Sequence, residues 1–316
     1  MVKILNLKPN IMTKDDIVNM RPASVELCKE LLCATSLGRA THCNATIYSF
    51  DGGVLSELMQ EVGRLRKISF EAVGVAMPRC EAIDDADLDG TYRQLIVWDN
   101  DAGQIIGGYR YAVGSVAPVD RLSIARYFTL SDRFVRDYLP RGIELGRSFV
   151  QPYYQRGRNP KTIFALDALW EGLARVVTQE RADYLFGRVT LYPSLGIRAR
   201  NLIFGFMQYI FPRREALVSA RDPLVGGVSR RWLRRCFVGN TPRENYRILI
   251  SRVRAMRRSV PPILSSYMRL SPSMQTFDLY RNDDLGGVAE CGIMLTIADL
   301  YDDVKRRYFS HLAMPH

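Results

Sequence analysis

Hydrophobic and polar positions alternate with two different periods in the first half of the chain. Residues 45–50 alternate at every second position, as the half-buried strands of a sheet do, whereas residues 54–70 repeat apolar side chains at helical spacing. Two more apolar runs, 92–98 and 104–111, flank residues 99–103, whose Asn, Asp and Gly content is typical of a hairpin turn. The pattern predicts a strand and a helix, followed by two antiparallel strands.

A strand, a stop and a helix start are predicted between residues 143 and 170. Strand-forming side chains fill residues 143–150, and Pro152, which cannot donate a backbone hydrogen bond, is expected to end the strand. Apolar residues then recur at helical spacing from Thr162 onward. A helix N-terminus behind a basic loop that contains glycine binds phosphate-bearing groups. We therefore expect a phosphate to be held by the loop residues Gln155, Arg156, Gly157 and Arg158.

The pattern continues with helices and strands toward the end of the chain. The order β-α-β-β-β-α-β-α is complete by residue 211. We divide the chain into an N-terminal accessory helical segment (1–43), a core (44–212) and a C-terminal part (213–316). The accessory segment is expected to hold a helix that starts after Ser24 and ends by Gly38. Later helices are expected at 163–177, 195–211, 246–260 and 299–312, and later strands at 184–191, 275–280 and 291–297.

The residues around the central strand resemble the GNAT superfamily of N-acyltransferases. The superfamily signature, a strand that ends in Val-x-Pro-x-Tyr before a basic glycine loop, is similar to residues 150–158. The preceding Glu-Leu-Gly-Arg-Ser, residues 144–148, narrows the resemblance to N-acyltransferases of the ornithine-lipid and glycine-lipid type, sometimes labelled hemolysin-like, and to the related acylhomoserine-lactone synthases. The similarity covers about residues 45–312. It implies an α+β fold, with a mixed, mostly antiparallel central sheet flanked by helices and a C-terminal α/β extension.

In the families that the chain resembles, a fatty acyl chain passes from the phosphopantetheine arm of acyl carrier protein to an amine. The resemblance implies acyl carrier protein as a partner, an amino acid as acceptor, and no permanently bound cofactor. The donor is then an acyl-phosphopantetheine, carried by acyl carrier protein or by coenzyme A. The usual loop ends in a further Gly or Ala where Asn159 and Pro160 stand here, which weakens the case for a gripped coenzyme A pyrophosphate but is compatible with a carrier arm. On this resemblance Phe149 and Val150 also belong to the donor site.

The same resemblance assigns further site residues. Arg66 matches an arginine near the acyl-donor cleft, and Arg110 matches the arginine of a Gly-x-x-Arg strand that points into the active site; an exposed helix or sheet face explains each equally well. Arg147 belongs to the Glu-Leu-Gly-Arg-Ser motif. The acidic loop 84–89 matches a family loop that could cradle a cationic acceptor amine or be simply solvated, and calcium is disfavoured because the loop lacks the glycine and closing glutamate of an EF-hand. The expected substrate residues are Asp85, Asp87 and Asp89.

Amide formation from a thioester needs an uncharged amine, a group that takes its proton, and donors for the developing oxyanion. Glu144 lies six residues before Val150, so the period of two places both side chains on one face, where burial would raise the pKa of Glu144 toward that of a useful base. It is our candidate base, directly or through water; the alternative is a structural ion pair with Arg147 or Arg110. The backbone N–H of Val150 is expected to meet the donor. The candidates to protonate the leaving thiolate are Tyr192 and Tyr209.

Composition and charge narrow the compartment and the partners. The chain has 316 residues, a formal charge of +11 and six cysteines without a C-x-x-C pair, which predicts a cytoplasmic protein with acidic partners. No metal site is expected, because the chain has only three histidines and two of them, His311 and His316, lie at the C-terminus without a companion Cys or carboxylate at ligand spacing. No apolar run approaches the roughly 20 residues that span a bilayer, so any membrane contact is expected to be peripheral, on the inner membrane face.

Residues 212–258 form a strongly basic segment. It carries thirteen arginines and no lysine, against three acidic residues. A helical projection of residues 246–260 separates apolar side chains from arginines, which is typical of a basic amphipathic helix. Anionic lipid, acyl carrier protein or the protein's own core would each accommodate such a helix. Nucleic acid is disfavoured, because few aromatic side chains are interleaved for base stacking.

The resemblance implies an N-acyltransferase that moves a long-chain fatty acyl group, 3-hydroxy chains included, from acyl carrier protein to an amino acid. That reaction is the first step of ornithine-lipid or glycine-lipid synthesis, and the acceptor stays open. Two alternatives remain: an acetyl-coenzyme A-dependent N-acetyltransferase acting on a small molecule, and a non-catalytic basic membrane-associated protein with a GNAT-like fold.

Overall fold

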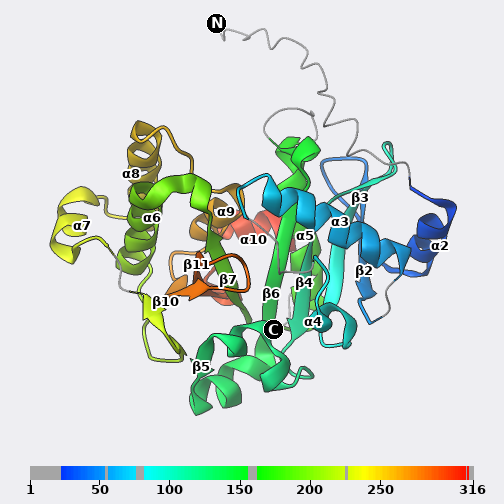
Figure 1. Ribbon diagram of the computed structural model, residues 1–316, viewed down its shortest axis with the longest axis horizontal. Coiled ribbons are helices and arrows are strands. Elements are labelled where there is room, and N and C mark those ends of the chain that lie inside the picture. The colour runs from blue at the N-terminus through cyan, green and yellow to red at the C-terminus, as the bar shows by residue number, and fades with distance from the viewer. Residues whose placement is uncertain are drawn as a thin grey trace, which may run out of the picture.

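A computed structural model describes residues 23–53, 56–75, 82–155, 162–224, 227–310 and 312 of the chain. Within these residues, nine strands form one sheet in the order β1-β2-β3-β4-β6-β7-β11-β10-β9 (Figure 1). Neighbouring strands are antiparallel except β6 and β7, which run parallel. The strands of this sheet are β1 (Thr35–Arg39), β2 (Ala45–Asp51), β3 (Arg93–Asp99), β4 (Gln104–Val113), β6 (Gly142–Val150), β7 (Tyr184–Leu191), β9 (Pro223–Leu224), β10 (Gln275–Asn282) and β11 (Val288–Thr296).

A separate two-stranded sheet lies beside the large one. It pairs β5 (Phe128–Leu130) with β8 (Val218–Ala220), two strands that are far apart in the sequence. The described helices are α2 (Val25–Cys33), α3 (Glu57–Glu71), α4 (Asp85–Leu88), α5 (Thr162–Gln179), α6 (Gly196–Ile210), α7 (Arg230–Cys236), α8 (Pro242–Ala255), α9 (Pro262–Leu270) and α10 (Asp302–Phe309).

Helices α3 and α5 cover opposite faces of the sheet. On one face Met59 of α3 packs in a cluster with Ile96 of β3. On the other face Leu169 of α5 packs with Leu95, the neighbour of Ile96 in the same strand. Successive side chains of a strand point to opposite faces, so the two clusters report the two sides of one sheet. The sheet is therefore buried between helical layers, as burial of both its apolar faces requires.

The C-terminal part of the chain adds strands to the same sheet. β11 pairs with β7 from Ala289↔Leu191 to Thr296↔Tyr184, and β10 pairs with β11. Helices α6 and α8 pack together beside these strands, and Leu249 and Val253 of α8 are buried in the main core. The apolar stripe of the basic helix thus packs against the protein itself. Within the described residues, none of the helices is both long and apolar enough to cross a bilayer.

The structure confirms the predicted fold class, an α+β fold with a mostly antiparallel sheet flanked by helices. Element ends differ from the predictions in several places. The helix predicted to end by Gly38 stops at Cys33, because β1 follows at once and Gly38 lies within that strand. The last helix starts at Asp302, three residues later than predicted. The helix after β7 starts at Gly196, as the pattern indicated within one residue.

Candidate active site

The parallel strands β6 and β7 part in the middle of the sheet. Their pairing runs from Gly142↔Tyr184 to Leu145↔Gly187 and stops there, five residues before the end of β6, while β7 continues along β11. A cavity of about 880 Å³ opens beyond the last pair. Both diverging strands contribute to its lining, with Gly146, Arg147 and Ser148 from β6 and Arg188, Val189 and Thr190 from β7.

A β-bulge in β6 turns its side chains over. Between the pairs Arg110↔Gly146 and Gly108↔Phe149, β6 uses one residue more than β4, and Arg147 adopts a left-handed φ of 50°. Because of this extra residue, Phe149 faces the α3 cluster and Val150 faces the α5 cluster. The predicted placement of Glu144 and Val150 on one face is therefore wrong. A bulge inserts one residue into the two-residue period and reverses every position after it.

Glu144 lines the cavity as a buried carboxylate, with 1% of its surface exposed. The Tyr92 hydroxyl donates to Oε2 at 2.5 Å, and the Ile124 N–H donates to Oε1 at 2.8 Å. Burial raises the pKa of Glu144, and the Tyr92 hydrogen bond and the charges of Arg188 and Arg110 offset only part of that rise. Among the described residues no arginine pairs with Glu144, so the predicted alternative of an ion pair with Arg147 or Arg110 is wrong.

Arg110 and Arg147 share a different carboxylate. Asp84 accepts from Arg110 Nη1 at 2.5 Å and from Arg147 Nη2 at 2.7 Å. Burial alone would raise the pKa of Asp84, but the two guanidinium groups hold it well below its usual value. Arg110 also donates to Ser123 Oγ at 2.8 Å and lies 4.6 Å above the Tyr92 ring. All three charged groups line the cavity, where the predictions had named only the two arginines.

The three predicted substrate residues of the acidic loop divide into one that is buried and two that are exposed. Asp87 is fully buried and accepts from Arg66 Nη1 at 2.8 Å and from Gln94 Nε2 at 3.0 Å. Burial lowers the pKa of Arg66 to about 10. Neither Arg66 nor Asp87 is part of the cavity lining, which places their ion pair behind the wall. Asp85 and Asp89 do line the cavity, and both are exposed.

A second buried carboxylate, Glu290 of β11, lines the cavity from the opposite wall and was absent from the predictions. It accepts from Arg188 Nη1 at 3.1 Å, Thr190 Oγ1 at 2.7 Å, Asn282 Nδ2 at 2.9 Å and the Tyr280 hydroxyl. Burial would raise the pKa of Glu290, but the charge of Arg188 and these hydrogen bonds hold it below its usual value. The detectable signal was a lone acidic residue inside an otherwise apolar strand.

The predicted donor residues Phe149 and Val150 lie at the far end of β6, and neither is part of the cavity lining. The Gln151 N–H donates to the carbonyl of Ile106 in β4 at 3.0 Å, and N–H groups alternate sides along a strand, so the Val150 N–H points to the side that β7 has left. The Val150 carbonyl accepts from Ser69 Oγ at 3.3 Å and from the Gln155 side chain. The predicted loop residues Arg156, Gly157 and Arg158 lie outside the described residues.

The structure separates the two tyrosines considered as acids. Tyr192 follows β7 and lines the cavity, and burial raises its pKa to about 12. Tyr209 lies on α6, is half-buried against the main core and is not part of the cavity lining. Only Tyr192 is therefore placed to reach a group bound in the cavity.

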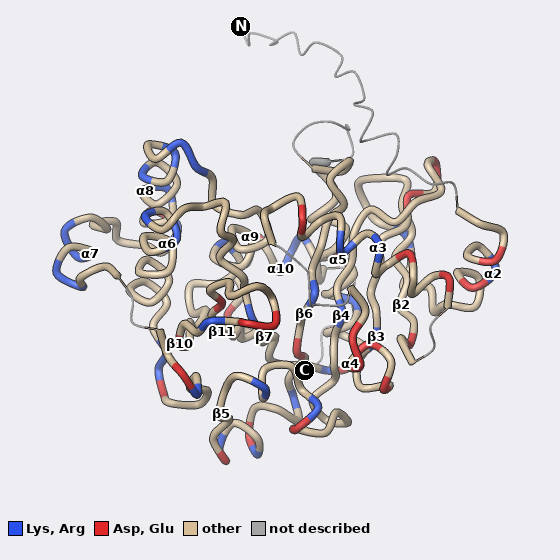
Figure 2. Tube along the Cα trace, viewed as in Figure 1, with Lys and Arg blue, Asp and Glu red and all other residues tan. Residues whose placement is uncertain are grey.

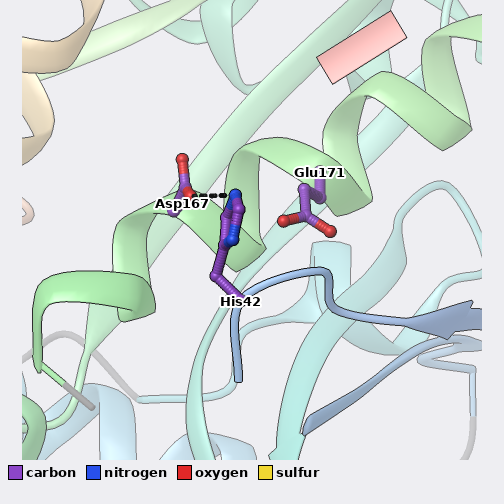
Figure 3. A group of neighbouring side chains, drawn as sticks. All are labelled: His42, Asp167 and Glu171. Carbon is purple, nitrogen blue, oxygen red and sulfur yellow. Dashed lines mark ion pairs between the residues drawn. The ribbon is translucent and has the colours of Figure 1, made fainter. Parts of the chain in front are cut away.

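A cluster of His42, Asp167 and Glu171 has the composition of a metal site but lies outside the cavity (Figure 3). Its carboxylates are already occupied by other donors. Asp167 accepts from Arg307 Nε at 2.8 Å and Nη2 at 2.6 Å, which ties α10 to α5, and Glu171 accepts from the backbone and hydroxyl of Thr41, each at 2.9 Å. The Arg307 guanidinium already neutralises the Asp167 carboxylate that a metal cation would need, so these residues do not fit a metal ion.

Comparison with known proteins places the chain in a family. Residues 65–165 match a family model described as an acetyltransferase (GNAT) domain. The glycine N(alpha)-acyltransferase of Bacteroides thetaiotaomicron is 38% identical over 94% of this chain and 91% of its own length, and that of Phocaeicola vulgatus is 34% identical over 93% of each. The crystal structure of the AHL synthase LasI has 16% identity and a TM-score of 0.32 over 52% of this chain and 79% of its own, values that bear on neither activity nor substrate. The chain thus belongs to the GNAT acyltransferase family that includes these two bacterial enzymes, which confirms the predicted family, and it is an N-acyltransferase.

Proposed function

We propose that the enzyme transfers a long-chain acyl group from the phosphopantetheine arm of acyl carrier protein to the α-amine of glycine, the first step in making an aminolipid. The observation that carries the proposal is Glu144, a buried carboxylate with a raised pKa, in the cavity that opens where β6 and β7 part. The names of the two bacterial relatives favour glycine over ornithine as acceptor.

The reaction needs few groups, and the cavity together with the adjoining end of β6 supplies them. The glycine nitrogen attacks the thioester carbon, a C–N bond forms, the C–S bond breaks, and the nitrogen loses its proton to Glu144, directly or through a water molecule. The leaving thiolate takes a proton from Tyr192, which lines the same cavity and regains a proton from solvent. The Val150 N–H, which points into the space between the strands, donates to the thioester oxygen or to a pantetheine amide.

The cavity walls also offer groups that match the two ends of an amino acid. Asp85 attracts an ammonium group, and so does Asp89, whose side chain is partly exposed and also pairs with Arg121 at 3.3 Å. The fully buried Asp87, by contrast, is occupied by Arg66 and leaves the proposed substrate set. Arg221 lines the cavity, donates to the carbonyl of Ala125 at 3.0 Å, and has no carboxylate at ion-pair distance among the described residues. We assign it to the acceptor carboxylate, because a guanidinium binds a carboxylate through two parallel hydrogen bonds.

The positive charge of the chain and the lipophilic product bear on the acyl donor and on the location of the enzyme. A basic segment at 155–158, ahead of α5, suits the single phosphodiester of a carrier arm. The positive formal charge of the chain favours association with an acidic protein such as acyl carrier protein. A product with a long acyl chain partitions into lipid, so the proposal places the enzyme in the cytoplasm in peripheral contact with the inner face of an anionic membrane.

Turnover of Glu144→Gln with acyl carrier protein as donor and glycine as acceptor tests the proposed base. We expect kcat to fall by about 10²- to 10⁴-fold, the usual contribution of a positioned base. Glu171→Gln is the matched control, because Glu171 is equally buried but lies outside the cavity. This control is expected to lose stability while the folded enzyme keeps its turnover. Full activity in Glu144→Gln would refute the assignment.

Substrate identity is tested separately with the unmodified enzyme. Long-chain acyl carrier protein is compared with acetyl and long-chain coenzyme A as donors, and glycine with ornithine as acceptors, with the product identified by mass spectrometry. We expect the highest kcat/KM for long-chain acyl carrier protein and glycine. A strong preference for acetyl-coenzyme A would overturn the proposed donor, and a preference for ornithine would overturn the proposed acceptor.

A further inference from the structure

Helices α7 and α8, with the two residues Arg257 and Arg258 that follow α8, display arginines that have no acidic partner among the described residues. Each is exposed, and none forms an ion pair with another residue in the described part of the chain. Residues 230–260 contain a single acidic residue, Glu244, which caps a backbone N–H of Asn240 at 2.8 Å. Figure 2 shows the positive residues along both helices, at one end of the molecule. This arginine surface consists of Arg230, Arg231, Arg234, Arg235, Arg247, Arg254, Arg257 and Arg258.

Large apolar side chains are exposed between these arginines. Trp232 is 41% exposed, Val238 72% and Met256 38%. The Trp232 ring is steadied by the guanidinium of Arg252, which lies 5.5 Å from the ring centre. Leu233, on the other side of α7, is buried in the main core. The short helix α7 is thus anchored through one side and presents a tryptophan and four arginines on the other.

We propose that the arginine surface, with Trp232, Val238 and Met256, docks the enzyme on an anionic lipid bilayer. Arginine guanidinium groups pair with lipid phosphates, and tryptophan is favoured at the boundary between headgroups and acyl chains. Charge alone would also suit an acidic protein. The exposed apolar side chains interleaved with the arginines favour a bilayer, because insertion buries them while the arginines stay among the headgroups.

The position of this surface in the chain links it to the cavity. Residues 256–260 lead from α8 to α9, and Pro261, Ile263 and Leu264 at the start of α9 line the cavity. Docking through α8 would therefore bring one wall of the active site close to the bilayer. This purpose rests on the proposed function, since a long-chain acylated product would be released beside the membrane that takes it up, but the docking itself does not depend on turnover.

Vesicle flotation of the full-length protein, without substrates, tests the docking. Vesicles of phosphatidylcholine alone are compared with vesicles that also contain phosphatidylglycerol. We expect binding to the anionic vesicles only, weakened by salt. Replacing Arg230, Arg231, Arg234 and Arg235 together by Glu should weaken binding on the order of 100-fold or more, at about 1 kcal/mol for each arginine near an anionic surface. Trp232→Ala should weaken it roughly several-fold without any change of charge.

The control reverses charge on another part of the surface. Arg133→Glu/Arg136→Glu changes two exposed arginines that are already paired with acidic residues, and should leave vesicle binding unchanged. Circular dichroism melting verifies that each variant is folded. The proposal is overturned if the wild type does not bind anionic vesicles, binds phosphatidylcholine equally well, or binds as before in the fourfold variant. A fourfold variant with intact vesicle binding and a raised KM for acyl carrier protein would assign the surface to the carrier protein instead.

These results are separable from the fate of the proposed reaction. Vesicle binding by an enzyme that proves to acetylate small amines would uphold the docking surface and reject the aminolipid function. Acylation of glycine from long-chain acyl carrier protein, without vesicle binding, would uphold the aminolipid function and reject the docking surface.

Discussion

The arginines around the cavity and those of the arginine surface differ in whether they are paired with carboxylates. Inside, Arg110 and Arg147 share Asp84, and Arg188 pairs with Glu290. Outside, the arginines of the arginine surface are exposed, and none of them pairs with a carboxylate among the described residues. A buried charge without a partner costs several kcal/mol, so folding itself enforces the inner pairs. An exposed charge loses little by standing alone, so folding does not account for an accumulation of unpaired arginines. Binding to an anionic partner would account for this accumulation of unpaired arginines.

The largest expected effect comes from breaking an inner pair. Asp84→Asn leaves Arg110, which is 3% exposed, with Asp87 at 3.5 Å as its one remaining carboxylate at ion-pair distance among the described residues. We expect a loss of about 2 kcal/mol or more in the free energy of unfolding, somewhat below the cost for a fully buried pair because Asp84 is 28% exposed. Turnover should fall as well, because both arginines line the cavity. Urea unfolding and steady-state kinetics measure the two effects.

Asp283→Asn is the matched control for Asp84→Asn. Asp283 also pairs with an arginine, Arg281, at 2.7 Å, but its side chain is 77% exposed. Its loss is expected to leave the unfolding midpoint and turnover unchanged. Equal behaviour of the two variants would contradict the distinction between inner and outer charges.

A smaller effect is expected on the pH dependence of the reaction. The pKa of Glu144 is raised by burial and lowered in part by the Tyr92 hydrogen bond, so Tyr92→Phe should raise the pKa of Glu144 further. A base acts only when deprotonated, and a higher pKa means that a higher pH is needed to deprotonate it. The acidic limb of kcat/KM should therefore move to higher pH, with activity recovering at alkaline pH.

A purely structural role of Tyr92 would give a different profile, with activity lowered equally at every pH. Tyr111→Phe is the control, because the Tyr111 hydroxyl is also buried and bonded, to Ser49 at 2.8 Å, but does not line the cavity. Its pH profile should coincide with that of the wild type. An acidic limb that stays in place in Tyr92→Phe would argue against Glu144 as the titrating base.

The sequence predicted local features well and through-space pairing poorly. Periodicity and Pro152 were sufficient to place β6 and its end at Val150. Nothing in the local pattern revealed the bulge at Arg147, since a non-glycine residue at positive φ has no reliable signature. The missed bulge led to the wrong face for Val150 relative to Glu144.

The partners of the charged residues were the other part that the sequence left open. Arg66, Arg110 and Arg147 were singled out, but the carboxylate that each one binds lies 21 to 63 residues away in the sequence, from Arg66–Asp87 to Arg147–Asp84. Glu290 was missed because it comes from β11, far from the motif, and reaches the cavity only because β11 pairs with β7. Such neighbours follow from sheet topology, which local patterns do not encode.

The smallest change in stability is expected at the arginine surface, where a single substitution should affect membrane binding and folding in opposite directions. Arg231 lies in the first turn of α7, which has no acidic residue, and is followed at helical spacing by Arg234 and Arg235. Arg231→Glu would put a negative charge at the positive end of the helix and opposite two arginines, stabilising the protein by a few tenths of a kcal/mol. The same change should weaken binding to anionic vesicles about tenfold or more, because two units of charge are reversed at the membrane.

Arg235→Glu provides the matched comparison for Arg231→Glu. It makes the same change of charge in the last turn of α7, where a cation is favoured by the helix dipole. Both variants should lose vesicle binding to a similar extent, but Arg235→Glu should lower the melting temperature while Arg231→Glu raises it. A gain in stability together with a loss of binding at Arg231 would show that this arginine serves the membrane at the expense of the fold. Undiminished vesicle binding in both variants would mean that the arginines of α7 accumulate for a reason other than contact with a membrane.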